Sequence, residues 1–229
     1  MAFYRGPNVV TNGLIVALDA ANRNSYISGS STFRSVGQEL STASIGSGLL
    51  FDGISLSGSA AISFPGAYST FQTQQGTYSL WVKMMDGNPI SSTIVFYSGG
   101  TTNNLCYLYR NTNFSPNSAY GWLLYYTGSA GLGAYLPIST YSTSSWTNTV
   151  LTYTSDGTGS VYINSTLINR TNMANFTQWN RVSANSPSIQ MAAGTNQPGS
   201  FSNFQFYNRA LSASEIQQNY NAQKSRFGL

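Results

Sequence analysis

The sequence predicts an all-β fold: an antiparallel β-sandwich of two sheets that ends in one short α-helix. Three observations support this prediction. Many short segments rich in β-branched and aromatic residues are separated by clusters of Gly, Ser and Asn that favour turns. One helix pattern with a capping signal occurs, at the C-terminus, so the alternating helices that connect parallel strands are missing. The length of 229 residues fits a single sandwich domain.

The N-terminal residues predict an arm that precedes the sandwich domain. Residues 1–13 contain the pairs Gly6-Pro7 and Asn12-Gly13, both of which favour turns. We therefore expect residues 1–13 to form an extended arm. The sandwich domain is then expected to cover residues 14–229.

The expected strands follow the arm in a regular series. They lie within LIVALD (14–19), LLFDG (49–53), AISF (61–64), GTYSLWVKM (76–84), TIVFYS (93–98), LCYLYR (105–110), YGWLLYYT (120–127), NTVLTYTSDGTGSVYIN (148–164), SIQMAAG (188–194) and the start of the last segment, 201–229. The segment 148–164 predicts a hairpin, because its two β-rich halves flank the turn-forming sequence SDGTG. Loops with short strands are expected between residues 20 and 48, where no period is sustained.

Alternation is clearest in the strand predicted at residues 76–84. There Tyr78, Leu80, Val82 and Met84 share one face, and polar residues and Trp81 share the other. A strand with this period has one face against the core and one face turned away from it. Residues 76–84 therefore give the clearest strand signal in the interior of the chain.

The last segment combines a strand with a capped helix. Phe204 and Phe206 alternate with Gln205 and Tyr207, which predicts a half-buried strand. The helix pattern follows directly after this strand. The segment therefore predicts a helix laid against the sheet that its own strand joins.

The predicted helix has a start signal and an apolar face. Ser212 and Glu215 have the spacing of a capping box, in which each side chain binds the backbone N–H of the other residue. Ala213, Ile216 and Tyr220 recur at helical spacing and predict the buried face.

The composition limits the classes of function. Charged residues make up 7% of the chain, against roughly 25% in an average soluble domain, which favours an assembled or extracellular structural protein over an ordinary cytosolic enzyme. The net charge of +4 comes from scattered Lys and Arg residues, so no nucleic-acid partner is expected. Cys106 is the single cysteine, which rules out an intrachain disulfide. No apolar run is long enough for membrane insertion, and no signal-peptide core is present.

The polar residues offer little for catalysis. The chain contains no histidine, which excludes catalytic triads and imidazole metal sites. Its six carboxylates include no pair within a short motif, although a glycosidase needs two that converge. Calcium binding by oxygen ligands stays open, and Asp19, Asn22 and Asp52 are the candidate ligands by position. The alternative is that these residues form turns through side-chain to backbone hydrogen bonds.

Aromatic residues gather in the central part of the chain. Carbohydrate binding uses aromatic faces beside hydroxyl and amide groups, and this region supplies them; the candidate binding residues are Tyr107, Tyr109, Arg110, Trp122 and Tyr126. The alternative is that these aromatic residues belong to the core or to a subunit interface, where Tyr and Trp are also enriched.

Several of these segments together carry a family resemblance. The sequences NGLIVALDAAN, LLFDG, YSLWVKM, WTNTVLTYTSDGTGSVYIN and FYNRALSASEIQQNYNAQKSRFG resemble the concanavalin A-like lectin/glucanase superfamily, and more narrowly the laminin-G-like modules of tailed-bacteriophage virion proteins. The opening MAFYRGPNVVTNGL is similar to the N-termini of such phage proteins. The resemblance implies a jelly-roll β-sandwich.

The resemblance and the composition lead to three functional hypotheses. The first is a non-enzymatic structural protein on the virion surface, in the capsid or the tail, that contacts other virion proteins and self-associates as a homo-oligomer. In this hypothesis the arm residues Phe3, Tyr4 and Arg5 anchor each copy on a neighbour. The second is a carbohydrate-binding adhesion module that recognises glycans of a host surface or mucus. The third is a glycoside hydrolase.

Overall fold

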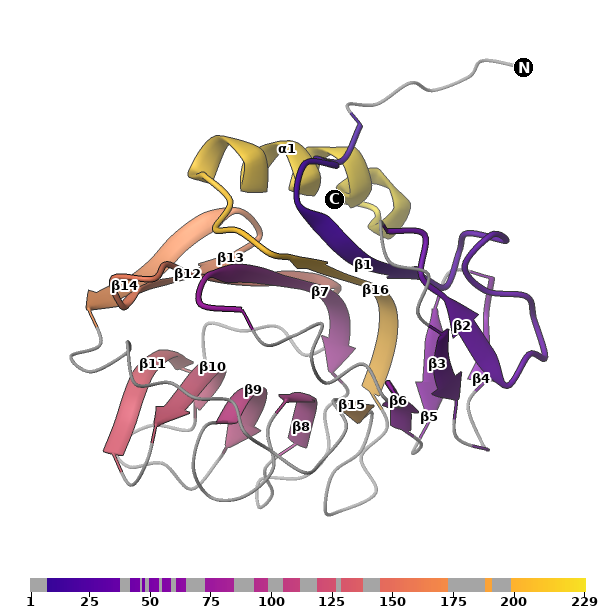
Figure 1. Cartoon of the computed structure of the whole chain (residues 1–229). Coiled ribbons are helices and arrows are strands. Elements are labelled where there is room, and N and C mark those ends of the chain that lie inside the picture. Colours follow the sequence, from indigo (N-terminus) through magenta and orange to yellow (C-terminus); the bar gives the residue numbers. More distant parts are fainter. Residues whose placement is uncertain are drawn as a thin grey trace.

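A computed structural model shows a sandwich of two antiparallel sheets. It describes residues 8–37, 42–45, 47, 50–53, 55–58, 61–64, 73–84, 93–98, 105–111, 119–126, 129–137, 145–172, 188–190 and 199–229. For the described residues between 93 and 137, and for residues 188–190, the description is limited to the backbone. Figure 1 shows the two sheets as stacked layers, with one helix lying on the outer face of one of them.

The first sheet carries the helix and has eight strands. In spatial order they are β14 (Thr166–Asn172), β13 (Thr158–Ile163), β12 (Thr147–Tyr153), β7 (Gly76–Met84), β16 (Gly199–Tyr207), β5 (Leu56–Gly58) and β4 (Leu50–Phe51), and β1 (Leu14–Asp19) also pairs with β16. We call it the helix-side sheet. The predicted hairpin is confirmed as β12 and β13, joined by a turn in which Gly157 has a φ of 88°.

The second sheet also has eight strands and lies on the other side of the core. Its order is β11 (Ser129–Pro137), β10 (Ala119–Tyr126), β9 (Leu105–Asn111), β8 (Thr93–Ser98), β15 (Ser188–Gln190), β6 (Ala61–Ser63), β3 (Thr42–Ile45) and β2 (Thr32–Arg34). Strand β11 was not predicted, because Gly and Ala dilute its alternation (SAGLGAYLP), and strands β5 and β14 of the first sheet were not predicted either. The predicted β-sandwich is confirmed.

The core lies between the sheets and follows the predicted alternation. Phe204 and Phe206 of β16 and Tyr78 and Leu80 of β7 are fully buried in it. The rings of Tyr78 and Phe206 lie 4.8 Å apart, centroid to centroid. Packed rings of this kind bury large apolar areas, which is the main force that holds two sheets together.

The helix α1 (Ala213–Gln223) starts with the predicted capping box, and the 3-10 helix η4 (Lys224–Phe227) follows it. The prediction of its apolar face was partly wrong. Ala213 is exposed, because it lies in the first turn beyond the edge of the contact. The buried residues are Ile216, Asn219 and Gln223, so this helix buries two amides beside its apolar contacts with the sheet.

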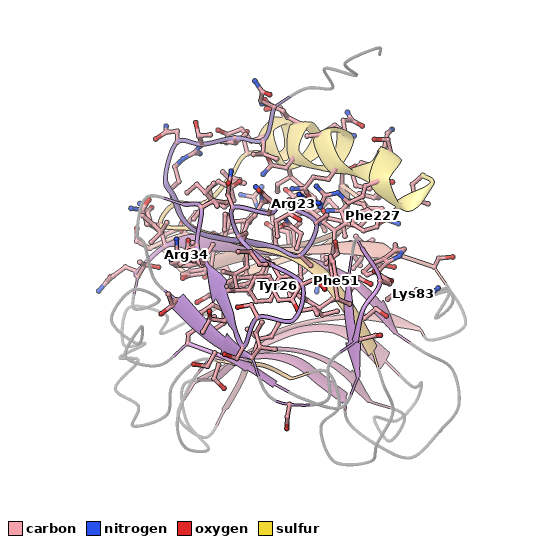
Figure 2. All side chains as sticks on the ribbon, turned by 90° about the vertical axis from the view of Figure 1, so that its right-hand side faces the viewer. Arg23, Tyr26, Arg34, Phe51, Lys83 and Phe227 are labelled. Atoms are coloured by element: carbon pink, nitrogen blue, oxygen red, sulfur yellow. The ribbon has the colours of Figure 1, made fainter. Side chains whose placement is uncertain are left out.

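Aromatic stacking fixes the C-terminal end of the helix. Trp81, on the outer face of β7, stacks on Tyr220 at 5.6 Å and on Phe227 at 4.2 Å between ring centroids. Figure 2 shows Phe227 near this end of the helix, with Tyr26 and Phe51 below it.

No helix among the described residues is both long and apolar enough to cross a membrane.

Candidate functional site

A groove of about 1080 Å³ lies on the outer face of the helix-side sheet, beside the C-terminal end of α1. Strands β1 and β16, which run side by side beneath the helix in Figure 1, form its floor. The lining residues are Asn8, Val9, Thr11, Leu14, Ala17, Asp19, Asn22, Val36, Asn203, Gln205, Ala222, Gln223, Ser225 and Arg226. Amide and hydroxyl groups therefore lie beside small aliphatic surfaces.

The floor of the groove is polar because of strand alternation. Phe204 and Phe206 point to the core, so Asn203 and Gln205 of the same strand face the helix side. On β1 their partners in register are Asp19 and Ala17. The sequence pattern already indicated that Gln205 points away from the core, but it gave no sign that a groove would lie above it.

Two oxygen atoms of this floor are unusual. The side-chain oxygens of Asn203 and Gln205 are buried and have no hydrogen-bond partner within the described part of the chain. Each of these residues is 2% exposed. Buried polar atoms in proteins are nearly always hydrogen-bonded, because an unpaired one destabilises the fold. These two oxygens are therefore exceptions that need a physical explanation.

An ion pair closes one end of the groove. The Nη1 and Nη2 atoms of Arg226 donate to the two carboxylate oxygens of Asp19 at 2.8 and 3.1 Å. Asp19 also accepts the backbone N–H of Ala21 at 3.0 Å. This pair joins the end of β1 to the C-terminal helix and neutralises both charges.

The N-terminal segment forms one wall and is held by a closed set of hydrogen bonds. Val10 donates its N–H to Asn219 Oδ1 at 2.7 Å and accepts at its carbonyl from the Tyr207 hydroxyl at 3.0 Å. Asn219 Nδ2 donates to the same hydroxyl at 3.0 Å. Burial raises the pKa of Tyr207 above its ordinary value, so the phenol keeps its proton.

The wall residues belong to the segment that was predicted as an arm, residues 1–13. Asn8 and Val10 of that range bind the chain's own helix, through Gln218, which donates to the carbonyl of Asn8 at 2.7 Å, and through Asn219. Phe3, Tyr4 and Arg5, the predicted anchor residues, lie outside the described residues. Their contact with a neighbouring copy stays a prediction.

The candidate calcium ligands make turn and ion-pair contacts. Asp19 binds Arg226, Asn22 Oδ1 accepts the N–H of Asn24 at 3.0 Å, and Asp52 accepts the N–H and hydroxyl of Ser55 at 2.6 and 2.8 Å. The bonds from the N–H groups of Ala21, Asn24 and Ser55 are the local contacts that the turn interpretation predicts, whereas the ion pair of Asp19 with Arg226 is a long-range contact. In the described ranges, no group of three or more acidic, Cys or His side chains is placed to hold a metal. Calcium binding stays a prediction.

The predicted carbohydrate-binding residues lie on two neighbouring strands of the other sheet. Tyr107, Tyr109 and Arg110 belong to β9, and Trp122 and Tyr126 belong to β10. The register pairs Tyr109 with Gly121 and Trp122 with Leu108. The backbone thus places these positions on adjacent strands of the sheet that lies across the core from the groove, at register positions that belong to both faces of that sheet. Carbohydrate binding by these residues stays a prediction.

The described carboxylates outside the groove are engaged in structural contacts. Arg209 donates two hydrogen bonds to Glu215, at 2.9 and 2.6 Å, and lowers the pKa of that carboxyl to about 2. Hydrogen bonds from the Thr154 hydroxyl and the Thr158 N–H lower the pKa of Asp156. A general acid needs a raised pKa. The pKa values of Glu215 and Asp156 are lowered instead.

Solved structures with the same fold include toxin and enzyme chains. A structure of the botulinum neurotoxin serotype D binding domain has a TM-score of 0.72 and 13% identity, and the match covers 94% of this chain and 53% of that one. A botulinum neurotoxin type C structure has a TM-score of 0.71 and 12% identity, and the match covers 92% of this chain and 51% of that one. A mutant of Trypanosoma rangeli sialidase has a TM-score of 0.68 and 18% identity, and the match covers 94% of this chain and 34% of that one. The chain thus spans about half the length of the toxin chains.

The sequence comparisons give the family. Curated proteins provide no significant match. The family model described as "Concanavalin A-like lectin/glucanases superfamily" matches residues 56–217, which include β5 to β16 and the first turns of α1. The jelly-roll sandwich, the resemblance carried by the sequence motifs and this match agree. The chain belongs to the concanavalin A-like lectin/glucanases superfamily.

Proposed function

We propose that this protein is a non-catalytic, lectin-like module that binds glycans. The observation that carries the proposal is the chemistry of the groove, where amides and hydroxyls lie beside small aliphatic side chains. A sugar presents hydroxyl groups around its ring and apolar C–H patches on its faces, so it needs both kinds of surface. Membership of a superfamily that includes lectins supports the same conclusion.

The state of the carboxylates supports binding without hydrolysis. Glycoside hydrolysis uses two carboxyl groups, one of them with a raised pKa. Asp19, Asp52, Asp156 and Glu215 are instead engaged by an arginine or by turn and cap groups. Glu39 and Asp86 lie outside the described residues.

The structural neighbours give further support to a binding role. Cell entry of the type C toxin is dependent upon interaction with two ganglioside molecules. The binding domain of toxin DC has been solved in complex with rat synaptotagmin II. By analogy, we propose that this chain uses the same fold to recognise a surface ligand.

A glycan array tests the proposal, with a hydrolysis assay on every glycan that binds. We expect binding of one or more glycans in the micromolar to millimolar range and unchanged glycans after long incubation. Binding to none of the glycans in that range would overturn the proposed function. Release of shortened products would replace it with a hydrolase.

A second candidate function is a structural protein of a tailed-phage virion, on the capsid or tail surface. Two observations favour it: the content of charged residues is 7%, and the opening sequence is similar to those of phage structural proteins. Quantitative mass spectrometry of purified particles tests it. Hundreds of copies per particle would indicate the capsid, a few copies would indicate the tail, and absence from the particle would refute the role.

A further inference from the structure

We infer that Asn203 and Gln205 are the ligand-reading residues of the groove and that its ligand is an uncharged, hydroxyl-rich sugar. This inference rests on the proposed function and assigns it to specific side chains. It starts from the two buried amide oxygens that have no partner in the described part of the chain. Because both side chains line the groove, a ligand bound there can supply the missing hydrogen-bond partner.

Other buried amide side chains in the outer layer do form hydrogen bonds. Asn148 on β12 donates from Nδ2 to Ser79 Oγ at 3.2 Å and to the carbonyl of Leu80 at 3.3 Å. Asn219 on the helix uses both ends of its amide. The fold therefore satisfies buried amides elsewhere on this face. The two exceptions both line the groove.

The chemistry of an amide favours a hydroxyl as the partner. An amide presents an acceptor oxygen and a donor NH₂ group, and a half-turn about its last bond exchanges them. A hydroxyl group both donates and accepts, so it can pair with whichever atom faces the groove. A carboxylate or phosphate only accepts, and an ammonium group only donates. Asn203 and Gln205, two positions apart on one strand, would thus contact two hydroxyls of one ligand.

The charge of the groove selects an uncharged ligand. Arg226 is the one cation among the described lining residues, and Asp19 is the one anion. They neutralise each other through two hydrogen bonds, with side chains that are 29% and 15% exposed. An anionic sugar would have to separate this pair before it could use Arg226. The pair therefore acts against charged ligands.

The shape of the groove fits more than one sugar ring. Its volume of about 1080 Å³ lies slightly above the roughly 300–1,000 Å³ found for small-molecule sites. Val9, Leu14, Ala17, Val36 and Ala222 supply apolar surface for the C–H faces of the rings. A disaccharide or a longer chain end is the ligand class that uses this space.

The test replaces each floor amide with an apolar side chain of similar size, as Asn203→Leu and Gln205→Met. The probes are the neutral disaccharides lactose, maltose, cellobiose and N,N′-diacetylchitobiose, titrated at millimolar concentration and followed by NMR. We expect at least a roughly tenfold weaker affinity in each variant, because a lost polar contact discriminates strongly. Thermal midpoints should not fall, because the replaced oxygens have no hydrogen-bond partner among the described residues that could be lost. Gln75→Met, at an exposed amide outside the groove, is the matched control and should bind as wild type.

The outcomes separate the two proposals. If wild type binds and the floor variants bind equally well, the inference is wrong and the proposed function stands. If wild type binds none of the probes but binds other glycans on the array, the inference about the ligand is also wrong. If wild type binds no glycan at all, both proposals fail. Weaker binding together with a lowered thermal midpoint in both variants would assign the amides a structural role and contradict the inference.

A second variant tests the part played by charge. Asp19→Asn removes the anion but keeps an oxygen that can accept the N–H of Ala21. Arg226 is then free to bind an anion, so affinity for glucuronic acid should rise by about tenfold relative to glucose. An unchanged ratio of the two affinities would show that the ion pair does not control ligand charge.

Discussion

The two faces of the helix-side sheet are built by the same strands with opposite chemistry. On the inner face Phe204, Phe206 and Tyr78 pack against the second sheet and are fully buried. On the outer face Asn203 and Gln205 come from the same strand and are almost as buried, at 2% exposed, but they are polar and line the groove. Side chains are therefore buried on both faces, but only those on the outer face need hydrogen-bond partners.

The difference shows which face can carry specificity. Apolar contacts have no direction, so the inner face needs only the right volume. Each polar group on the outer face needs its own partner, as when Thr77 accepts from the N–H of Leu211 and donates to the carbonyl of Arg209, both at 2.9 Å. A group without a partner is then visible as an exception. The groove floor is where these exceptions lie.

The largest effect should come from the inner face. Phe204→Ala removes a fully buried ring that lies 5.6 Å from Phe64 between centroids, and it leaves a cavity. We expect the free energy of unfolding to fall by about 3–5 kcal/mol. Denaturant unfolding followed by circular dichroism measures this loss. Phe204→Leu keeps most of the volume and should lose clearly less; equal losses in the two variants would contradict a role through volume.

Most of the fold was predictable because its signals are local. Alternation in β7 and β16, the turn before Thr158 and the cap at Ser212 each depend on neighbours in the sequence. Strand β11 was missed because its pattern depends on glycines that give no face preference. The exposure of Ala213 was missed because helical spacing does not show where the sheet ends.

An intermediate effect should come from the satisfied polar network of the outer layer. Asn219→Ala removes the partner of the Val10 N–H and one partner of the Tyr207 hydroxyl, and both groups are buried. We expect a loss of about 2 kcal/mol in the free energy of unfolding, since unpaired buried groups carry a penalty of this size.

The neighbouring amide gives a control for this network. Gln218→Ala removes an exposed hydrogen bond to the carbonyl of Asn8, so its effect should stay within about 0.5 kcal/mol. Hydrogen exchange of the Val10 amide should accelerate in Asn219→Ala and not in Gln218→Ala. Similar losses in both variants would mean that burial does not set the strength of these contacts.

The candidate site was much less predictable than the fold. Its groove joins residues 8–11, β1, β16 and the C-terminal helix, which are as far apart in the sequence as Val10 and Asn219. The sequence marked Asp19 as a strand end but could not show that Arg226, 207 positions later, would bind it. Pairing across such distances follows from topology, and no local pattern encodes it.

The smallest effect should come from the partly exposed rim of the outer layer, where Arg209 pairs with Glu215. Hydrogen bonds from Arg209 lower the pKa of Glu215 from its ordinary value of 4.5 to about 2. A lowered carboxyl pKa stabilises the fold above the ordinary pKa, and this stabilisation disappears as the pH falls toward the folded value. Because solvent screens the pair, we expect a loss of about 1 kcal/mol rather than the full value of the shift.

The matched variant for this pair is Glu215→Gln, which can keep the capping box while it removes the charge. Unfolding free energies of both proteins, measured from pH 4.5 to pH 2, give the contribution of Glu215 as the difference between two curves. The wild type should be the more stable at pH 4.5, and the curves should converge toward pH 2. Parallel curves would show that the ion pair adds no stability. The rim would then serve only to place the helix end, and the outer layer would depend on its buried amide network alone.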